Sequence, residues 1–458
     1  MGDIGATDSW AYIRVGFLIG TEGMDLLRGI LGLVTILAIA FALSADRKAI
    51  QWKTVAAGLS LQIVLALLLL KGPDMATWFA PLGWVSDGFA AVSSFFVNVL
   101  DYTQAGTSFL FGNMADPAAE LGVGFVFAFQ VLPIIIFFGS LMAVLYHLGI
   151  MQRIVQAMAL VVRRTLGVSG AESLSVTANI FVGQTEAPLV VKPFINRMTR
   201  SEIMAVMAGG MATIAGSVMA AYIALLGDSF AAWQGLETGA GRALFAKQLL
   251  AASVMAAPAS LLLSKMLIPE TEIPETRDSA TIAIDQTHRN VIDAAASGAG
   301  DGLRLAANVG AMLLAFLALI AMLNGILGGV GSWFDVDLSL ELMLGYLLAP
   351  LAWLIGIPSA EITAFGSLIG QKVILNEFVA YVELSKLIEA GTLSTKSITM
   401  ATFALCGFAN LSSIAIQIGG LGPIAPDRKG VLVELGLRAV LVGTLATLMT
   451  ATIAGALL

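Results

Sequence analysis

A short stretch of otherwise apolar sequence, residues 178–189, carries side chains that could bind a polar ligand. It combines amides, a hydroxyl and a carboxylate with two helix breakers, namely Asn179, Gly183, Gln184, Thr185, Glu186 and Pro188. Inside a bilayer a carboxylate costs at least about 2.5 kcal/mol, and irregular backbone is tolerated there only when it is buried in protein or lines water. We therefore expect a re-entrant hairpin whose tip lies in a cavity.

A second polar stretch, residues 366–378, has the same character. It repeats a Gly-Gln pair and contains a carboxylate, Glu377. Each stretch is followed by a span that is rich in Gly and Ser at its centre, residues 213–217 and residues 407–413. Paired interruptions in two halves of a chain indicate the binding site of a secondary transporter, because unwound helices expose backbone groups near the middle of the membrane.

The composition places these stretches in a membrane protein. Of the 458 residues, 58% are hydrophobic and only 12% are charged, whereas soluble domains carry about 25% charged residues. The alternating polarity of a β-barrel is absent. One Cys and two distant His exclude a disulfide framework and a transition-metal site, and a net charge of -7 offers no basic face for nucleic acid.

The predicted fold class is an all-α polytopic membrane protein with eight transmembrane helices. A span needs about 20 apolar residues, and the candidates are residues 29–45, 54–70, 121–147, 202–226, 241–266, 302–328, 398–422 and 430–456. Interfacial helices are expected at residues 10–19, 90–100, 151–168 and 340–357. Counting residues 340–357 as a span would move Arg428 and Lys429 to the outer face, against the positive-inside rule.

Lys and Arg gather in four connections that then share one face, so both termini are predicted to be periplasmic. The first hairpin enters from the cytoplasm, three spans follow, and the second hairpin enters from the opposite side; the halves form an inverted repeat with two broken helices. The expected segments are 1–28 (N-terminal interfacial segment), 29–170 (scaffold spans and interfacial helices), 171–266 (first hairpin, broken helix and span), 267–300 (cytoplasmic linker), 301–357 (scaffold span and interfacial helix) and 358–458 (second hairpin, broken helix and last span).

Three motifs in this order resemble those of the concentrative nucleoside transporter family: GQTEAPLVV at residues 183–191, NEFVAY at 376–381 and CGFANLSSI at 406–414. The likeness extends over residues 31–458. It implies a homotrimer of eight-span protomers with two opposed hairpins. It also implies import of nucleosides such as uridine, cytidine or adenosine, driven by a cation gradient, usually Na+ and sometimes H+.

The resemblance also implies site residues. Gln184, Thr185, Glu186 and Val218 would face the nucleobase, and Glu377, Asn410 and Ser413 would hold the ribose, with Phe408 lining the pocket. The coupling ion Na+ would be bound by the side chains of Asn179 and Thr213 and the backbone carbonyls of Val182 and Ile214. Hard oxygen ligands of this kind suit a hard cation.

Simpler roles remain open for several of these residues. Glu186 and Glu377 could each be held by a neighbouring donor, Asn179 could cap its turn, and Phe408 could be a packing residue. Lys372 is expected to pair with Glu377 or Glu361.

The leading functional hypothesis is a Na+-coupled nucleoside symporter of the bacterial inner membrane, working by alternating access of a hairpin-bearing transport domain. An H+-coupled symporter is the alternative. An intramembrane enzyme, for which a Ser or Thr near Glu186 is the sole candidate nucleophile, and a passive channel are the rivals from other classes.

Overall fold

The computed structural model describes residues 22–115, 126–277, 288–334 and 336–458. Within these ranges the chain is helical and contains no β-strand. The α-helices are α1 (Glu22–Ala42), α2 (Trp52–Leu70), α3 (Gly72–Ala76), α4 (Gly83–Phe111), α5 (Phe127–Gln130), α6 (Leu132–His147), α7 (Ile150–Leu166), α8 (Gly170–Ala178), α9 (Lys192–Ile195), α10 (Arg200–Ala212), α11 (Gly216–Gln234), α12 (Thr238–Leu267), α13 (Val291–Gly331), α14 (Leu340–Leu354), α15 (Ile362–Ile374), α16 (Glu377–Glu389), α17 (Thr395–Leu405), α18 (Leu411–Leu421) and α19 (Lys429–Leu457). Short 3-10 turns are η3 (Ala80–Leu82), η4 (Gly112–Ala115), η5 (Ala187–Val191), η6 (Ser332–Phe334) and η7 (Pro426–Arg428).

Six stretches of the described chain are long and apolar enough to cross a membrane. They are Trp52–Leu70, Phe127–His147, Arg200–Gln234, Thr238–Leu267, Val291–Phe334 and Pro426–Leu457. The other two predicted spans correspond to shorter helices: α1, whose apolar part is Leu26–Ala42, and the pair α17 and α18. The predicted number of eight therefore depends on these shorter helices.

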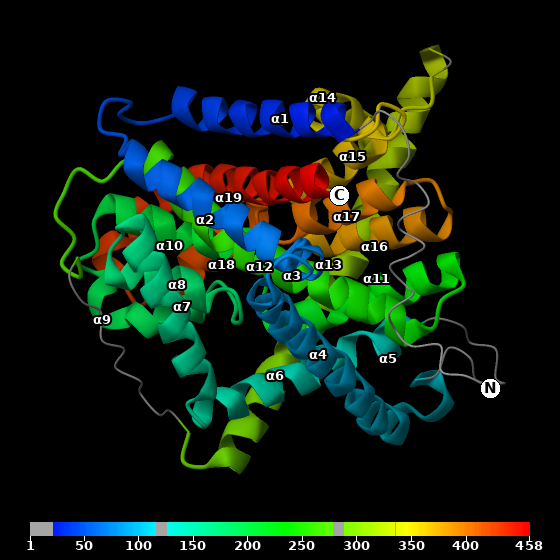
Figure 1. Ribbon diagram of the computed structural model, residues 1–458. Coiled ribbons are helices and arrows are strands. Elements are labelled where there is room, and N and C mark those ends of the chain that lie inside the picture. Colours follow the sequence, from blue (N-terminus) through cyan, green and yellow to red (C-terminus); the bar gives the residue numbers. More distant parts are fainter. Residues whose placement is uncertain (1–21, 116–125, 278–287, 335) are drawn as a thin grey trace.

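The buried core is formed by helices that follow each hairpin: α10 to α12 in the first half of the chain, and α17 and α19 in the second. The apolar window of α12 is 100% buried and that of α10 and α11 is 94% buried, whereas the window in α13 is only 11% buried. In Figure 1, α12, α17 and α19 lie near the centre, with α10 to the left, α1 along the upper side and α4 and α6 projecting from the lower side. The long apolar surface of α13 thus faces outward from this chain.

The order of elements occurs twice. The first series consists of the apolar stretch Phe127–His147, which contains α5 and α6, followed by α7, a hairpin, a broken helix and the long helix α12. The second series has the same order, with α13, α14, a hairpin, a broken helix and the long helix α19. The first helices of the two series, α6 and α13, pack closely and antiparallel. A Cβ on Gly298 would lie 2.5 Å from the carbonyl oxygen of Gly139, and one on Gly302 would lie 2.8 Å from Cα of Ile136. This antiparallel pair supports the predicted inversion, whose orientation in the membrane stays a prediction.

Two predicted segments need correction. The linker 267–300 is too long, because α13 begins at Val291, where the side chain of Asn290 accepts a 2.9 Å hydrogen bond from the backbone N–H of Asp293; a side-chain cap of this kind favours a helix start. The short helix at 90–100 is part of the 29-residue α4. The helix expected at residues 10–19, most of segment 1–28 and part of the linker lie outside the described residues.

The two other predicted interfacial helices are present as helices. Residues 151–168 correspond to α7, which lies between Gly149 and Gly167, both in the left-handed backbone conformation. Residues 340–357 correspond to α14, which packs along α15 of the second hairpin. The structure therefore makes α14 the neighbour of a hairpin arm, and its depth in the membrane stays a prediction.

Candidate functional site

The first hairpin consists of α8, a turn at residues 179–186, and η5 with α9. Its tip is closed by Glu186, whose Oε2 accepts a 2.9 Å hydrogen bond from the backbone N–H of Gly183. Its base is anchored by a capping box in which Glu172 closes the start of α8. Glu172 is buried and forms a 2.7 Å ion pair with Lys265 of α12. The hairpin is therefore fixed at its base by a buried ion pair.

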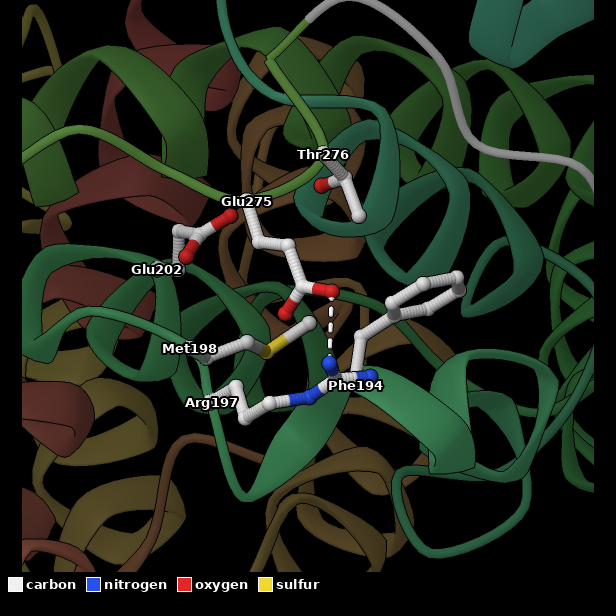
Figure 2. Close-up of a pocket in the computed structure, with 6 residues that line it drawn as sticks. All are labelled: Phe194, Arg197, Met198, Glu202, Glu275 and Thr276. Carbon is white, nitrogen blue, oxygen red and sulfur yellow. Dashed lines mark ion pairs between the residues drawn. The ribbon is translucent and has the colours of Figure 1, made fainter.

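A small pocket lies beside this base, at the end of α10 that is opposite its break (Figure 2). Its lining includes an exposed 2.8 Å ion pair between Arg197 and Glu275. Thr276, also in the lining, accepts hydrogen bonds from the backbone N–H groups of Gly170 and Ala171 at 2.9 and 3.1 Å. The pocket belongs to the anchor of the first hairpin and contains none of the predicted substrate residues.

The second hairpin turns more sharply than the sequence predicted. Residues 366–374 are regular helix, and only Leu375 and Asn376 separate α15 from α16. The side-chain oxygen of Asn376 accepts a 2.9 Å hydrogen bond from the backbone N–H of Val379 and so caps α16. Because Glu377 is the first residue of α16, this cap fixes its side chain at the hairpin tip.

The two helix breaks touch each other at the centre of the protein. The chain leaves helical geometry between Ala212 and Gly216, and again between Leu405 and Leu411. Gly407 has φ +150°, and a Cβ there would lie 2.7 Å from the carbonyl oxygen of Met211. A side chain has no room at this crossing, so only glycine allows the two backbones to approach so closely.

One hydrogen-bond network joins the tips of both hairpins to α11 and α18. Gln184 Nε2 donates to Ser413 Oγ at 3.0 Å. The backbone N–H of Ser413 donates to Asn410 Oδ1 at 2.9 Å, and Asn410 Nδ2 donates to Glu377 Oε2 at 2.9 Å. Tyr222 OH completes the network by donating to Glu377 Oε1 at 3.1 Å. The predicted polar residues of both halves are thus in direct contact.

The other predicted substrate residues surround this network without joining it. Val218 is buried on α11, one turn before Tyr222. Thr185 lies against Gly420 of α18, where a Cβ would approach its methyl group to 2.6 Å. Phe408 is half-buried beside the second break, and Glu186 is bonded to its own turn.

Two members of the network were not predicted. Gln417 is fully buried and donates from Nε2 to Gln184 Oε1 at 3.0 Å and to the carbonyl oxygen of Met207 at 2.9 Å. The other is Tyr222, the donor to Glu377. An amide inside the apolar helix α18 is a signal that could have identified Gln417, whereas a single Tyr in an apolar helix is normally read as packing.

The predicted cation ligands belong to the first hairpin and to the first break. Asn179 donates from Nδ2 to the carbonyl of Ser175 at 3.0 Å, but its Oδ1 and the hydroxyl of Ser175 have no hydrogen-bond partner among the described residues. The hydroxyl of Thr213 donates to the carbonyl of Gly209 at 3.0 Å, so its lone pairs remain free to bind. Val182 and Ile214 lie outside the helices, in the turn and in the break.

This part of the site contains neutral oxygen atoms only. No group of three or more His, Cys, Asp or Glu side chains that could hold a metal ion occurs in residues 22–115, 126–277, 288–334 and 336–458. Buried polar atoms without partners are costly. A small hard cation is the ligand that such neutral oxygens fit.

Lys372 does not form the predicted ion pair with Glu377 or Glu361. Its Nζ donates to the carbonyl oxygen of Ala404 at 2.8 Å and to the hydroxyl of Thr447 at 2.9 Å. Glu361 instead accepts from the hydroxyl of Ser394 at 2.9 Å. The prediction failed because Ala404 and Thr447 are distant in sequence and neither is charged.

Comparison with known proteins assigns the family. Residues 31–114 match the profile of the Na+ dependent nucleoside transporter N-terminus, residues 248–455 match that of its C-terminus, and residues 128–229 match a nucleoside recognition (Gate) profile. The nucleoside permease NupC of Helicobacter pylori is 42% identical over 93% of this chain and 96% of its own length. The chain belongs to the concentrative nucleoside transporter family.

A mammalian relative and a solved structure extend this likeness. The sodium/nucleoside cotransporter 1 of Mus musculus is 39% identical over 93% of this chain and 63% of its own length. The structure of CNTnw in an inward-facing substrate-bound state has a TM-score of 0.83 and 47% identity, covering 94% of this chain and 97% of that one. This chain is accordingly a multi-pass membrane protein of a family of transporters, not of enzymes.

Proposed function

We propose that the protein imports nucleosides by Na+-coupled symport. The observation that carries this proposal is the single network that links Gln184 on one hairpin tip to Glu377 on the other through Ser413 and Asn410. Amides can read the edge of a neutral base, and a carboxylate can accept hydrogen bonds from two vicinal ribose hydroxyls. A nucleoside between the tips would therefore exchange these internal hydrogen bonds for its own.

The coupling ion is proposed to be held by Asn179 and Thr213 with the carbonyls of Val182 and Ile214. Support comes from the unpartnered Oδ1 of Asn179 and from the contact that fixes the turn to the break, a 2.9 Å hydrogen bond from Gly216 N–H to the carbonyl of Phe181. A cation at this point would order the first hairpin. It would raise nucleoside affinity, and the nucleoside would raise cation affinity by the same factor.

Alternating access in this proposal moves the hairpins and broken helices against a scaffold that contains α4, α6 and α13. The proposed assembly is a homotrimer, in which the outward apolar surface of α13 would meet lipid or a second copy. The proposed location is a bacterial inner membrane with both termini periplasmic. Light scattering of the detergent-solubilised protein measures the oligomeric state, and a monomer would contradict the trimer.

The test of function is uptake of radiolabelled uridine and adenosine into proteoliposomes with an inward Na+ gradient, an inward H+ gradient, or neither. Accumulation only with Na+ is expected. Accumulation only with H+ would transfer the coupling to a carboxylate such as Glu186, and flux without accumulation would indicate a channel.

A pair of variants tests the ion site. Asn179→Leu should remove Na+ stimulation of uridine binding, because the free Oδ1 is lost, whereas Asn196→Ala should leave it unchanged, since Asn196 is exposed at the outer arm of the same hairpin. Full Na+ stimulation in Asn179→Leu would contradict the site.

A further inference from the structure

One buried charge of the described chain is the ammonium of Lys372. It lies on α15 of the second hairpin and is fully buried. No carboxylate of the described residues forms an ion pair with it, in contrast to the other buried lysine, Lys265, which contacts Glu172 and Glu270 at 2.7 and 3.4 Å. A buried charge without an ion-pair partner is costly. The carboxylate of Glu377 acts on it from beyond ion-pair distance, and the groups in contact with Lys372 must compensate for the rest.

The compensation comes from the end of a broken helix. The last four carbonyls of a helix lack partners within it and carry the negative end of its dipole. At the end of α17, Lys372 Nζ donates to the carbonyl of Ala404 at 2.8 Å, and Tyr381 OH of the same hairpin donates to the carbonyl of Thr402 at 2.9 Å. Both arms of the second hairpin thus cap α17 at its break.

The equivalent position of the first repeat has the opposite chemistry. There the hairpin that packs against α10 carries two acceptors, Asn179 Oδ1 and Ser175 Oγ, near the end of α8, and neither has a partner among the described residues. The arm packs on that end, because a Cβ on Gly209 would lie 2.7 Å from the side chain of Val176. One break therefore faces unpartnered acceptor oxygens, and the other faces a cation that is covalently attached to the chain.

We propose that the ammonium of Lys372 serves as a permanently attached cation of the second hairpin. It caps the α17 end of the second break with a positive charge, in the way that an exchangeable cation would bind at the break between α10 and α11. Its other contact, the 2.9 Å hydrogen bond to Thr447 of α19, ties the hairpin to the core. Lys372 is a positioning residue: it holds α15 and α17 so that Glu377 and Asn410 meet. This inference rests on the proposed function.

The test is equilibrium uridine binding to the full-length protein in Na+. Lys372→Ala should weaken uridine binding at least tenfold, and propylammonium, which replaces the deleted side-chain atoms with their charge, should restore it at least partly. 1-Propanol, similar in size and neutral, should not. Lys372→Met, which keeps the side chain as far as Cε without its charge, should be as weak as Lys372→Ala.

The opposite results would overturn the inference. Wild-type uridine affinity in Lys372→Met, or rescue by 1-propanol equal to that by propylammonium, would show that the side chain only fills space. Should Lys372→Ala fail to fold, the pair Thr447→Val and Thr444→Val provides the test, because the hydroxyl of Thr444 on the same helix donates within that helix, to the carbonyl of Val440. Several-fold weaker uridine binding is expected for Thr447→Val alone, and equal affinities would contradict the proposal.

The two proposals fail differently. Absence of uridine binding in the wild-type protein would refute the proposed function and this inference with it. Normal wild-type binding with unaffected Lys372 variants would refute the inference alone.

Discussion

Replacement of Glu377 by Gln tests the proposed ribose contact with little change to the protein itself. The side chain of Asn410 is fixed, because its Oδ1 accepts from Ser413 N–H at 2.9 Å and from Ser412 Oγ at 2.7 Å, so its Nδ2 must point at residue 377. In the Glu377→Gln protein the oxygen of the new amide can accept from that Nδ2, and the nitrogen of the new amide can donate to Tyr222 OH after the hydroxyl rotates. The ligand-free network therefore survives, and only the charged acceptor is lost.

The expected magnitude follows from the number of bonds. A hydrogen bond to a charged group contributes about 1 kcal/mol more than a neutral one. Two ribose hydroxyls then lose about 2 kcal/mol, a factor of about 30 in Kd. Calorimetric titration of the Glu377→Gln protein with uridine measures this loss, and gel filtration verifies that the protein remains folded.

The matched control is a ligand, not a second variant. 2′,3′-Dideoxyuridine lacks both hydroxyls, so the Glu377→Gln change should alter its affinity by less than about twofold if the interaction is with the ribose. An equal loss for uridine and for the dideoxy ligand would place the effect elsewhere, and unchanged uridine affinity would refute the ribose assignment altogether.

Two further predictions concern the centre of the protein. Gly407→Ala should lose about 3 kcal/mol of stability, because it combines a strained backbone conformation with a Cβ 2.7 Å from the carbonyl oxygen of Met211. The control is Gly419→Ala, which should keep its stability because nothing lies within 4 Å of the added Cβ. Equal melting temperatures of the two variants in detergent would contradict the close crossing at Gly407. Gln417→Leu should weaken uridine binding about fivefold by releasing Gln184, the loss of one neutral hydrogen bond; unchanged affinity with an unchanged melting temperature would show that Gln417 does not position Gln184.

Local sequence was sufficient to find the hairpins and the breaks. Polar residues and helix breakers within apolar sequence are costly unless their polar groups find hydrogen-bond partners. The structure provides such partners, because it brings Gln184, Glu377, Asn410 and Ser413 into one network. The family resemblance named these residues, and hydropathy alone would have located only the segments. Which atom bonds to which could not be predicted, because the partners lie up to 233 positions apart.

Helix lengths were predicted less well, for a physical reason. The first turns of α13 include Asp293 and Asp301, and α4 includes Asp101, so a hydropathy window ends before or breaks within these helices. Charged residues are nevertheless compatible with a helix, particularly acidic ones near its start. Hydropathy reports on the lipid-exposed part of a helix, and not on where its backbone hydrogen bonds begin.

The network crosses repeatedly between the two halves of the chain, and this bears on why both halves belong to one polypeptide. A symmetric pair of identical halves would present the same groups on both sides of its axis, as any isologous interface must. A nucleoside has two dissimilar ends, a flat heterocycle and a sugar. In the proposed binding mode the single chain presents a different group to each end of the nucleoside: the amide of Gln184 on one hairpin tip faces the base, and the carboxylate of Glu377 on the other faces the sugar. Because the two halves are fused in one polypeptide, their sequences can differ, and a nearly symmetric fold can bind an asymmetric solute.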